Sequence, residues 1–449
     1  MLAPSAPSAS KFWLALNRRG SLADLISLRY LLLRAWTAGG GLLAGLVQTF
    51  VFARVLDPER FSLFILVGAL GVSMWLFDLG FSKIIFVHLR NRFLAGEETL
   101  DIGAQANAIA VLYAVAVAVS AVICALLMGL RPGMSLWHAA EFGLFFFFSA
   151  FNLTWFVLRN VCVAIDQYIY FETLEACRRV VYLGLMLAML AGLPFSAFVI
   201  LINVSWGVLI VLAGNRLIKR RALAPQLSGI VAHIRGFFRE HRASALRTGT
   251  HAAGEVYFHS VLYLAVPLSF GLGAPTIVMD TGLKVFFGTL NLCSAACDLV
   301  VPRQTAGYSA RDYRTVIRAK LLAMSLCALP ALAIAALLLF DGKHLFALLL
   351  GHTAVMPATV TPILCVLLAA GVIKTPSNFL LQYTGHFKEI ATLSIVNALL
   401  MTAAIGIGLV CHSGIVGLLA IYAAVFMAAA LLYLGIAIRG PVRAARNGV

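Results

Sequence analysis

Apolar stretches of membrane-spanning length fill the chain from Ala35 to Ile438, and only short polar links separate them. A run of about 18 or more apolar residues is typical of a transmembrane helix, because a helix of ~20 residues crosses the hydrocarbon core of a bilayer. The pattern predicts an all-α polytopic membrane protein with about twelve spans. The predicted spans are residues 35–55, 61–87, 105–130, 138–160, 175–193, 196–217, 247–270, 276–298, 319–340, 358–377, 389–411 and 415–438.

Landmarks in the first half of the chain recur in the second half at an interval of about 220 residues. Asp78 and Lys83 in the first half correspond to Asp298 and Arg303 in the second. Two six-span repeats are common in transporters, whose substrate sites lie between the repeats near the bilayer midplane. The sequence therefore predicts two pseudo-symmetric six-helix bundles. The expected organisation is a cytoplasmic segment over 1–34, bundles over 35–217 and 247–438, a basic linker over 218–246 and a tail over 439–449.

The distribution of charge predicts how the chain is oriented. The sequence has 34 Lys and Arg against 18 Asp and Glu, a formal net charge of +16. The basic residues cluster between the spans and form no single surface stripe, which argues against a nucleic-acid partner. With both termini in the cytoplasm, only Arg54, Arg60, Arg131 and Lys343 fall on the outer side, as the positive-inside rule requires. The basic linker is expected to face anionic lipid or a cytoplasmic partner.

Ionisable residues inside the predicted spans are the candidate functional groups, because such groups cost roughly 2.5–3.5 kcal/mol at the bilayer centre and usually face a cavity or a partner. The seventh span carries polar residues at intervals of four, near one face of a helix. They are Arg247, His251, Glu255, His259 and Tyr263. Asp280 and Lys284 share a face of the eighth span. The pattern predicts a hydrated cavity whose cationic groups receive an anionic substrate. In the alternative, Asp280 pairs with Lys284 in its own helix and the histidines bond to neighbouring helices.

Arg34 and Lys83 lie near the inner ends of their spans, where they either extend to the interface or reach the cavity. The HxxxExxxH pattern of the seventh span spreads its groups along the helix, so we expect no metal site. The sequence has no GxSxG, HExxH or CxxC motif. This favours transport over enzymatic chemistry, with a membrane acyl- or glycosyltransferase as the alternative. The major facilitator class also has twelve spans, but its basic motif between spans two and three is missing.

Several stretches resemble Wzx-type polysaccharide flippases of the multidrug/oligosaccharidyl-lipid/polysaccharide (MOP) exporter superfamily. Residues Phe52–Lys83 resemble the first hairpin of that family, and Met279–Arg303 resemble its eighth span. The stretch LFALLLG and residues Asn378–Lys388 are similar to later parts of the family pattern. Ser62, where the family usually has glycine, and Asp280 depart from it.

This resemblance implies a bacterial inner-membrane flippase that moves an undecaprenyl-diphosphate-linked oligosaccharide from the inner to the outer leaflet by alternating access. On this basis we assign residues to three roles. Substrate binding is assigned to Lys284, Arg247, His251, His259 and Arg34, ion coupling to Glu255 and Asp280, and structural or gating roles to Asp78, Lys83, Asp298 and Arg303.

No cofactor is expected beyond a proton or Na⁺ gradient. The expected partners are the lipid-linked oligosaccharide, membrane lipids, a polysaccharide polymerase and a chain-length regulator. The alternative function is an ion-coupled drug or metabolite antiporter of the same superfamily, which would favour an acidic, aromatic cavity.

Overall fold

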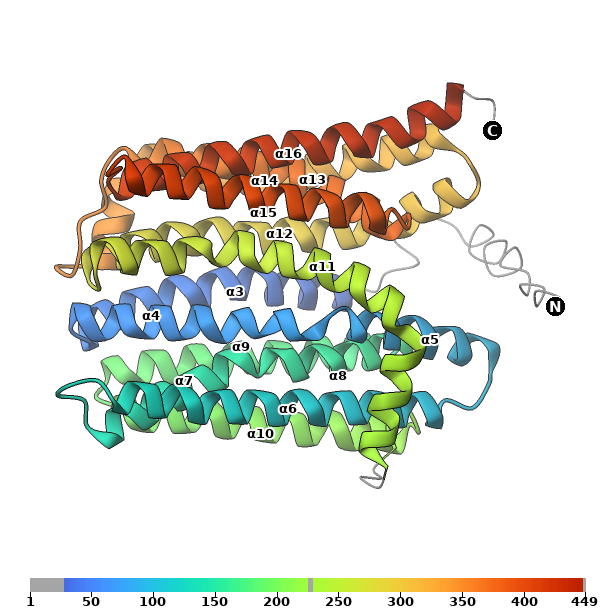
Figure 1. Cartoon of the computed structure of the whole chain (residues 1–449), viewed down its shortest axis with the longest axis horizontal. Helices are drawn as coiled ribbons and strands as arrows, with labels where there is room; N and C mark the ends of the chain where they lie inside the picture. The colour runs from blue at the N-terminus through green and yellow to red at the C-terminus, as the bar shows by residue number, and fades with distance from the viewer. Residues whose placement is uncertain (1–27, 225–228, 447–449) are drawn as a thin grey trace.

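The computed structural model describes residues 28–224 and 229–446, and every regular element in these ranges is helical (Figure 1). The all-α prediction is confirmed. Most helices run side by side along the long axis of the molecule. We call the end that holds α5 (Phe81–Ala95) the α5 end, and the opposite end, where α13 (Tyr313–Leu350) connects to α14 (Val360–Tyr383), the α13–α14 end.

The first half of the fold runs from α3 to α10. Its other elements are α3 (Leu28–Val55), α4 (Pro58–Ser73), the 3₁₀ helix η1 (Met74–Asp78), α6 (Leu100–Gly129), α7 (Leu136–Ala150), α8 (Asn152–Ala164), α9 (Tyr168–Leu190) and α10 (Phe195–Lys219). The expected span over 61–87 is broken, because Leu79 and Gly80 both take left-handed backbone with φ of 46° and 78°. A Cβ at Gly80 would lie 2.1 Å from the Thr248 hydroxyl, so only glycine fits this turn.

The second half runs from α11 to α16. Besides α13 and α14, it contains α11 (Ile230–Phe270), α12 (Ala274–Ser309), α15 (Phe387–Val410) and α16 (Ile415–Arg446). The segment expected as a linker is largely helical, because α11 begins at Ile230. Figure 1 shows this first part of α11 crossing the α5 end of the first half before the helix turns into the bundle.

Ten stretches in the described part of the chain are long and apolar enough to cross a membrane. Neither α9 nor α11 is among them, although each contains one of the twelve expected spans. Both helices carry several charged side chains inside the bundle, including Glu172 and Glu175 on α9 and Glu255 on α11. Glu172, Glu175 and Glu255 all take part in the polar sites described below.

Each half has its own apolar core. In the first half, Phe52 and Phe64 lie in a cluster of aromatic rings, and Phe64 stacks on Phe142 at a centroid distance of 4.2 Å. In the second half, the ring of Phe426 packs edge-on against Phe286 at 5.0 Å. The halves meet where α3 packs along α12. A Cβ at Gly288 of α12 would lie 2.4 Å from the Leu42 side chain and 3.1 Å from its Cα, so glycine permits this close approach.

Gly288→Ala is expected to lower the midpoint of thermal unfolding, because overpacking costs about 1–3 kcal/mol. Gly207→Ala on α10 is the matched control, since nothing lies within 4 Å of a Cβ there. Alanine is a better helix former than glycine by roughly 0.5–1 kcal/mol, so the unfolding midpoint of the control variant should not fall. Thermal unfolding of both variants in one detergent measures the difference. Equal midpoints would contradict a tight α3–α12 contact.

Candidate functional site

A cavity of about 560 Å³ lies between the two halves. Its walls come from α3, α4, η1, α7 and α9 of the first half and from α11, α12, α14 and α16 of the second. Aromatic rings line much of it: Phe64, Trp75, Phe145, Phe148, Tyr182, Tyr263, Phe287, Phe379 and Phe426. Its acidic, basic and histidine side chains all come from the second half and are Glu255, His259, Asp280, Lys284 and Lys374. We call this space the central pocket.

Lys374 and Glu255 form an ion pair in the wall of the central pocket. The Lys374 Nζ lies 2.7 Å from a Glu255 oxygen, and the Tyr433 hydroxyl donates to the other oxygen at 3.2 Å. The same ammonium lies 4.9 Å from the ring centroid of Phe426 and 5.1 Å from that of Phe258, within cation–π range. Lys374 is therefore held by charge and by aromatic faces together.

Sequence reasoning missed Lys374. Lys374 lies only three residues from the inner end of the expected tenth span, 358–377, and was not named among the candidate residues, but α14 continues to Tyr383. Lys374 lies nine positions before Tyr383 and thus roughly 14 Å from the helix end. Only 4% of Lys374 is exposed, so it does not extend to the interface. Its position inside an apolar run was the available signal.

Asp280 and Lys284 form the second ion pair, at 2.7 Å on one face of α12. The Tyr263 hydroxyl donates to Asp280 at 3.2 Å, and the Lys284 ammonium also donates to the Thr49 hydroxyl of α3 at 3.2 Å. The pairing within one helix is therefore present, and the pair also lines the pocket. Lys284 contacts both halves of the fold.

The central pocket is not net cationic, contrary to the expectation from the sequence. The two carboxylates Glu255 and Asp280 balance the two ammonium groups of Lys284 and Lys374 when His259 is neutral. The His259 Nε2 lies 3.6 Å from a Glu255 oxygen, so the imidazole joins the same group. The expectation failed in part because it placed Arg34 and His251 at the substrate site, and neither lines the pocket.

His251, expected at the substrate site, does not line the central pocket. Its Nδ1 lies 2.7 Å from the Ser394 hydroxyl of α15, and its Nε2 lies 3.0 Å from the Gln382 side-chain nitrogen of α14. It bonds to neighbouring helices, as the alternative reading proposed. The Arg247 side chain lies outside the described part of the structure.

Asp78 and Lys83 occupy the break between η1 and α5. The carboxylate of Asp78 is buried and accepts from the Ser82 backbone at 3.2 Å and from the Tyr113 hydroxyl at 3.2 Å. The Lys83 ammonium donates to the Gln382 side chain of α14 at 3.2 Å, across the two halves. The structure thus places Asp78 at the end of η1, where its carboxylate binds the first turn of α5, and Lys83 at the contact between the halves. Neither residue lines the pocket.

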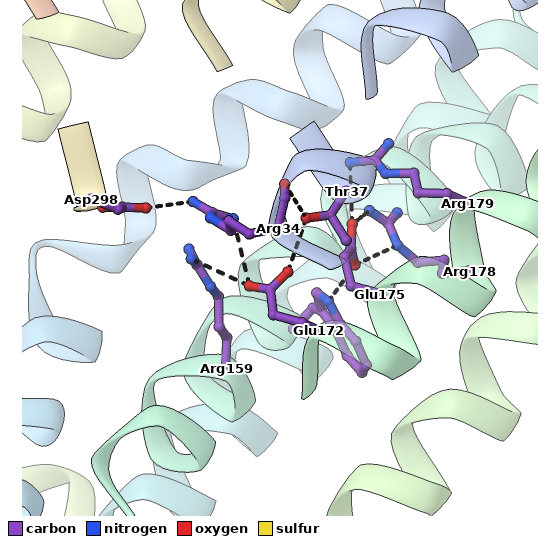
Figure 2. Close-up of polar contacts among 9 residues, drawn as sticks. Arg34, Thr37, Arg159, Glu172, Glu175, Arg178, Arg179 and Asp298 are labelled. Carbon is purple, nitrogen blue, oxygen red and sulfur yellow. Dashed lines mark hydrogen bonds and ion pairs between the residues drawn. The ribbon is translucent and has the colours of Figure 1, made fainter. Parts of the chain in front are cut away.

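Arg34 and Asp298 face each other (Figure 2), and neither residue lines the central pocket. The Arg34 Nη2 lies 2.7 Å from an Asp298 oxygen, and Nη1 lies 3.5 Å from Glu172. The Thr37 hydroxyl donates to Glu172 at 2.9 Å, and Arg159 lies 3.9 Å from the same carboxylate. Arg303, the predicted counterpart of Lys83, is exposed on α12.

A second cluster of charged side chains, centred on Glu175 of α9, lies beside the cluster around Arg34 (Figure 2). Glu175 pairs with Arg178 and, at 3.2 Å, with Arg179, and it accepts from the Trp155 ring nitrogen at 2.9 Å. The sequence did not predict this group, because the fifth span was expected to begin at residue 175 and α9 begins at Tyr168. Within the described residues, no group of three or more His, Cys, Asp or Glu side chains is placed to hold a metal ion.

The fold is similar to those of solved MATE family transporters. An inward-facing multidrug resistance MATE family transporter of the MOP superfamily has 14% identity and a TM-score of 0.65, covering 91% of this chain and 96% of that chain. A MATE structure in complex with MaL6 has 13% identity and a TM-score of 0.67, covering 93% and 96%. An outward-facing MATE family transporter of the same superfamily has 15% identity and a TM-score of 0.63, covering 95% and 98%.

The chain therefore has the fold of MATE transporters of the MOP superfamily, over nearly its full length. No family model matches the sequence. No curated protein matches it either. The likeness concerns the fold, and the substrate has to be argued from the central pocket.

Proposed function

We propose that the chain is an alternating-access membrane transporter whose substrate binds in the central pocket. The observation that supports this most is the position of the charged pairs. Glu255–Lys374 and Asp280–Lys284 lie at the boundary between two helical halves, in the walls of a cavity. Charges inside a membrane protein are costly and usually mark a transport path. Rocking of one half against the other would expose such a pocket to each side in turn.

The proposed substrate is an undecaprenyl-diphosphate-linked oligosaccharide, which the protein would flip from the inner to the outer leaflet. Lys284 and Lys374 supply two ammonium groups for the diphosphate, and Gln48, Asn291 and Asn378 supply amides for sugar hydroxyls. Each lysine is already paired with a carboxylate. An anionic headgroup therefore has to compete with that carboxylate for its lysine.

Glu255 is the proposed coupling group. Protonation of its carboxylate would remove the negative charge that holds Lys374 and leave the ammonium available to an anionic oxygen. Binding of the substrate would then be favoured when a proton is bound, which links the two in one transport cycle. Location in a bacterial inner membrane with both termini cytoplasmic remains our prediction, as do the polymerase and chain-length regulator as partners.

An ion-coupled drug antiporter is the second candidate, and the lining of the pocket favours it. Nine aromatic side chains line the cavity beside Glu255 and Asp280. Aromatic faces with carboxylates attract organic cations. The two candidates differ in the charge of the cargo. The lysines would bind the anionic glycolipid, and the carboxylates would bind an organic cation.

Transport in reconstituted vesicles tests the proposal. Purified protein in liposomes is expected to move a fluorescent lipid-linked oligosaccharide between leaflets faster than protein-free liposomes do. The pocket variant Asn291→Leu should slow this movement, and Gly207→Ala on the exposed face of α10 should not. Expulsion of a cationic dye without movement of the glycolipid would overturn the flippase assignment and support the antiporter.

A further inference from the structure

The Arg34–Asp298 pair joins the two halves of the fold at the α5 end. Arg34 belongs to α3 of the first half, and Asp298 belongs to α12 of the second. Within residues 28–224 and 229–446, every other ion pair lies inside one half or in the first part of α11. Separation of the halves at this end therefore has to break this pair.

The polar groups around Arg34 contain more positive than negative charge (Figure 2). Four arginines converge on the two carboxylates Glu172 and Glu175, and Asp298 adds a third carboxylate from the other half. The four are Arg34, Arg159, Arg178 and Arg179. With Asp298 in place, the site thus has one more guanidinium than carboxylates. When Asp298 withdraws, it has two more.

The arginines at this site also have unused hydrogen-bond donors. The Nε atoms of Arg34 and Arg179 are buried without a hydrogen-bond partner. Arg159 approaches Glu172 only at 3.9 Å, and its side chain is 31% exposed. A guanidinium has five N–H donors and suits the oxygens of a phosphate. Buried polar atoms without partners need an explanation, and an anion would satisfy them.

The depth of the site fits a lipid headgroup. Arg34 lies two residues inside the candidate span Leu32–Val55, and Asp298 lies three residues from the end of the candidate span Ala274–Val301. At 1.5 Å per residue, both lie about 3–5 Å from the α5 ends of these spans. If the ends of these candidate spans mark the surface of the bilayer, both residues lie at the interfacial level, where lipid phosphates are found.

We propose that Arg34 and Arg159 form a binding site for a phosphate or diphosphate group at the α5 end, and that Asp298 competes with this group for Arg34. The proposal rests on the proposed function, because it describes how the anionic headgroup would enter. While Asp298 holds Arg34, the halves are joined. An anion that takes Arg34 releases Asp298, and Arg34 keeps its contact with Glu172 in its own half. Binding of the anion and opening of the α5 end then occur together.

Binding of inorganic pyrophosphate to the purified full-length protein in an uncharged detergent tests this site. Asp298→Asn removes the competitor and is expected to tighten binding by fivefold or more, whereas Arg159→Gln should weaken it by a similar factor. The matched control is Asp166→Asn, which removes a carboxylate 2.7 Å from Arg90 at the same end but within one half. It should leave the affinity unchanged.

Unchanged or weaker binding by Asp298→Asn would overturn the proposal, because loss of a competitor cannot weaken a ligand. If that variant does not fold, Asp298→Ser carries the same test. A parallel titration uses a polyprenyl diphosphate in detergent micelles. If Asp298→Asn tightens and Arg159→Gln weakens the binding of both ligands, the site binds a lipid headgroup. If the variants change the affinity for pyrophosphate only, the site binds a free phosphate compound. Neither titration requires transport, so failure of the flippase assay leaves this result independent.

Discussion

Lys374→Met is expected to lower the free energy of unfolding by about 2–3 kcal/mol, because it leaves Glu255 without its ion-pair partner. Breaking a fully buried pair typically costs about 3–5 kcal/mol. The smaller value applies here because the Glu255 side chain is 19% exposed and keeps the hydrogen bond from Tyr433. The shift in thermal unfolding in a fixed detergent measures the loss.

The double variant Lys374→Met with Glu255→Gln is expected to recover most of this stability. It removes both charges of the pair, and paired buried charges are often replaced at little net cost. The same double variant should not transport, because both the anion-binding lysine and the proposed coupling carboxylate are gone. Recovery of stability with loss of transport separates function from folding. A double variant as unstable as Lys374→Met would show that the two residues do not act as a pair.

The second prediction concerns the charge of the cargo. Asp280→Asn and Lys284→Gln neutralise opposite members of one ion pair on α12. If the cargo is anionic, Asp280→Asn should strengthen its binding and Lys284→Gln should weaken it, each on the order of tenfold. One unit charge at about 4 Å is worth roughly 4 kcal/mol at an effective dielectric constant of 20, so a tenfold change is well within range.

If the cargo is an organic cation, Asp280→Asn should weaken its binding and Lys284→Gln should strengthen it. Both substitutions keep a hydrogen-bonding amide of similar size, and the Tyr263 and Thr49 hydroxyls remain as partners. Binding of the lipid-linked oligosaccharide and of a cationic dye to the same two proteins therefore distinguishes flippase from antiporter. Equal effects of both variants on one cargo would contradict a direct charge contact by this pair.

Much of the fold follows from the spacing of apolar residues. That spacing predicted the all-helical membrane class, because a bilayer forces spanning segments to satisfy their own backbone hydrogen bonds. The break at Leu79 and Gly80 was missed, since it depends on a close contact with Thr248 that is distant in sequence. The start of α9 was missed because charged residues there looked like a link between spans.

The site was predictable in part. The intervals of four brought Glu255 and His259 to one face of α11, and both line the central pocket. The sequence could not show that Lys374 of a different helix pairs with Glu255, because pairing between helices depends on how they pack. For the same reason Arg34 and His251, which share the polar character of the pocket residues, bind their partners elsewhere.

Access to the central pocket from both sides of the membrane tests the central claim most directly. Asn291→Cys places a thiol on an exposed lining position, in a background without the native cysteines. An alternating-access transporter should let a membrane-impermeant maleimide reach this thiol from either face of sealed vesicles, and bound substrate should slow both reactions. Reaction from one face only, whatever ligand is present, would contradict the account.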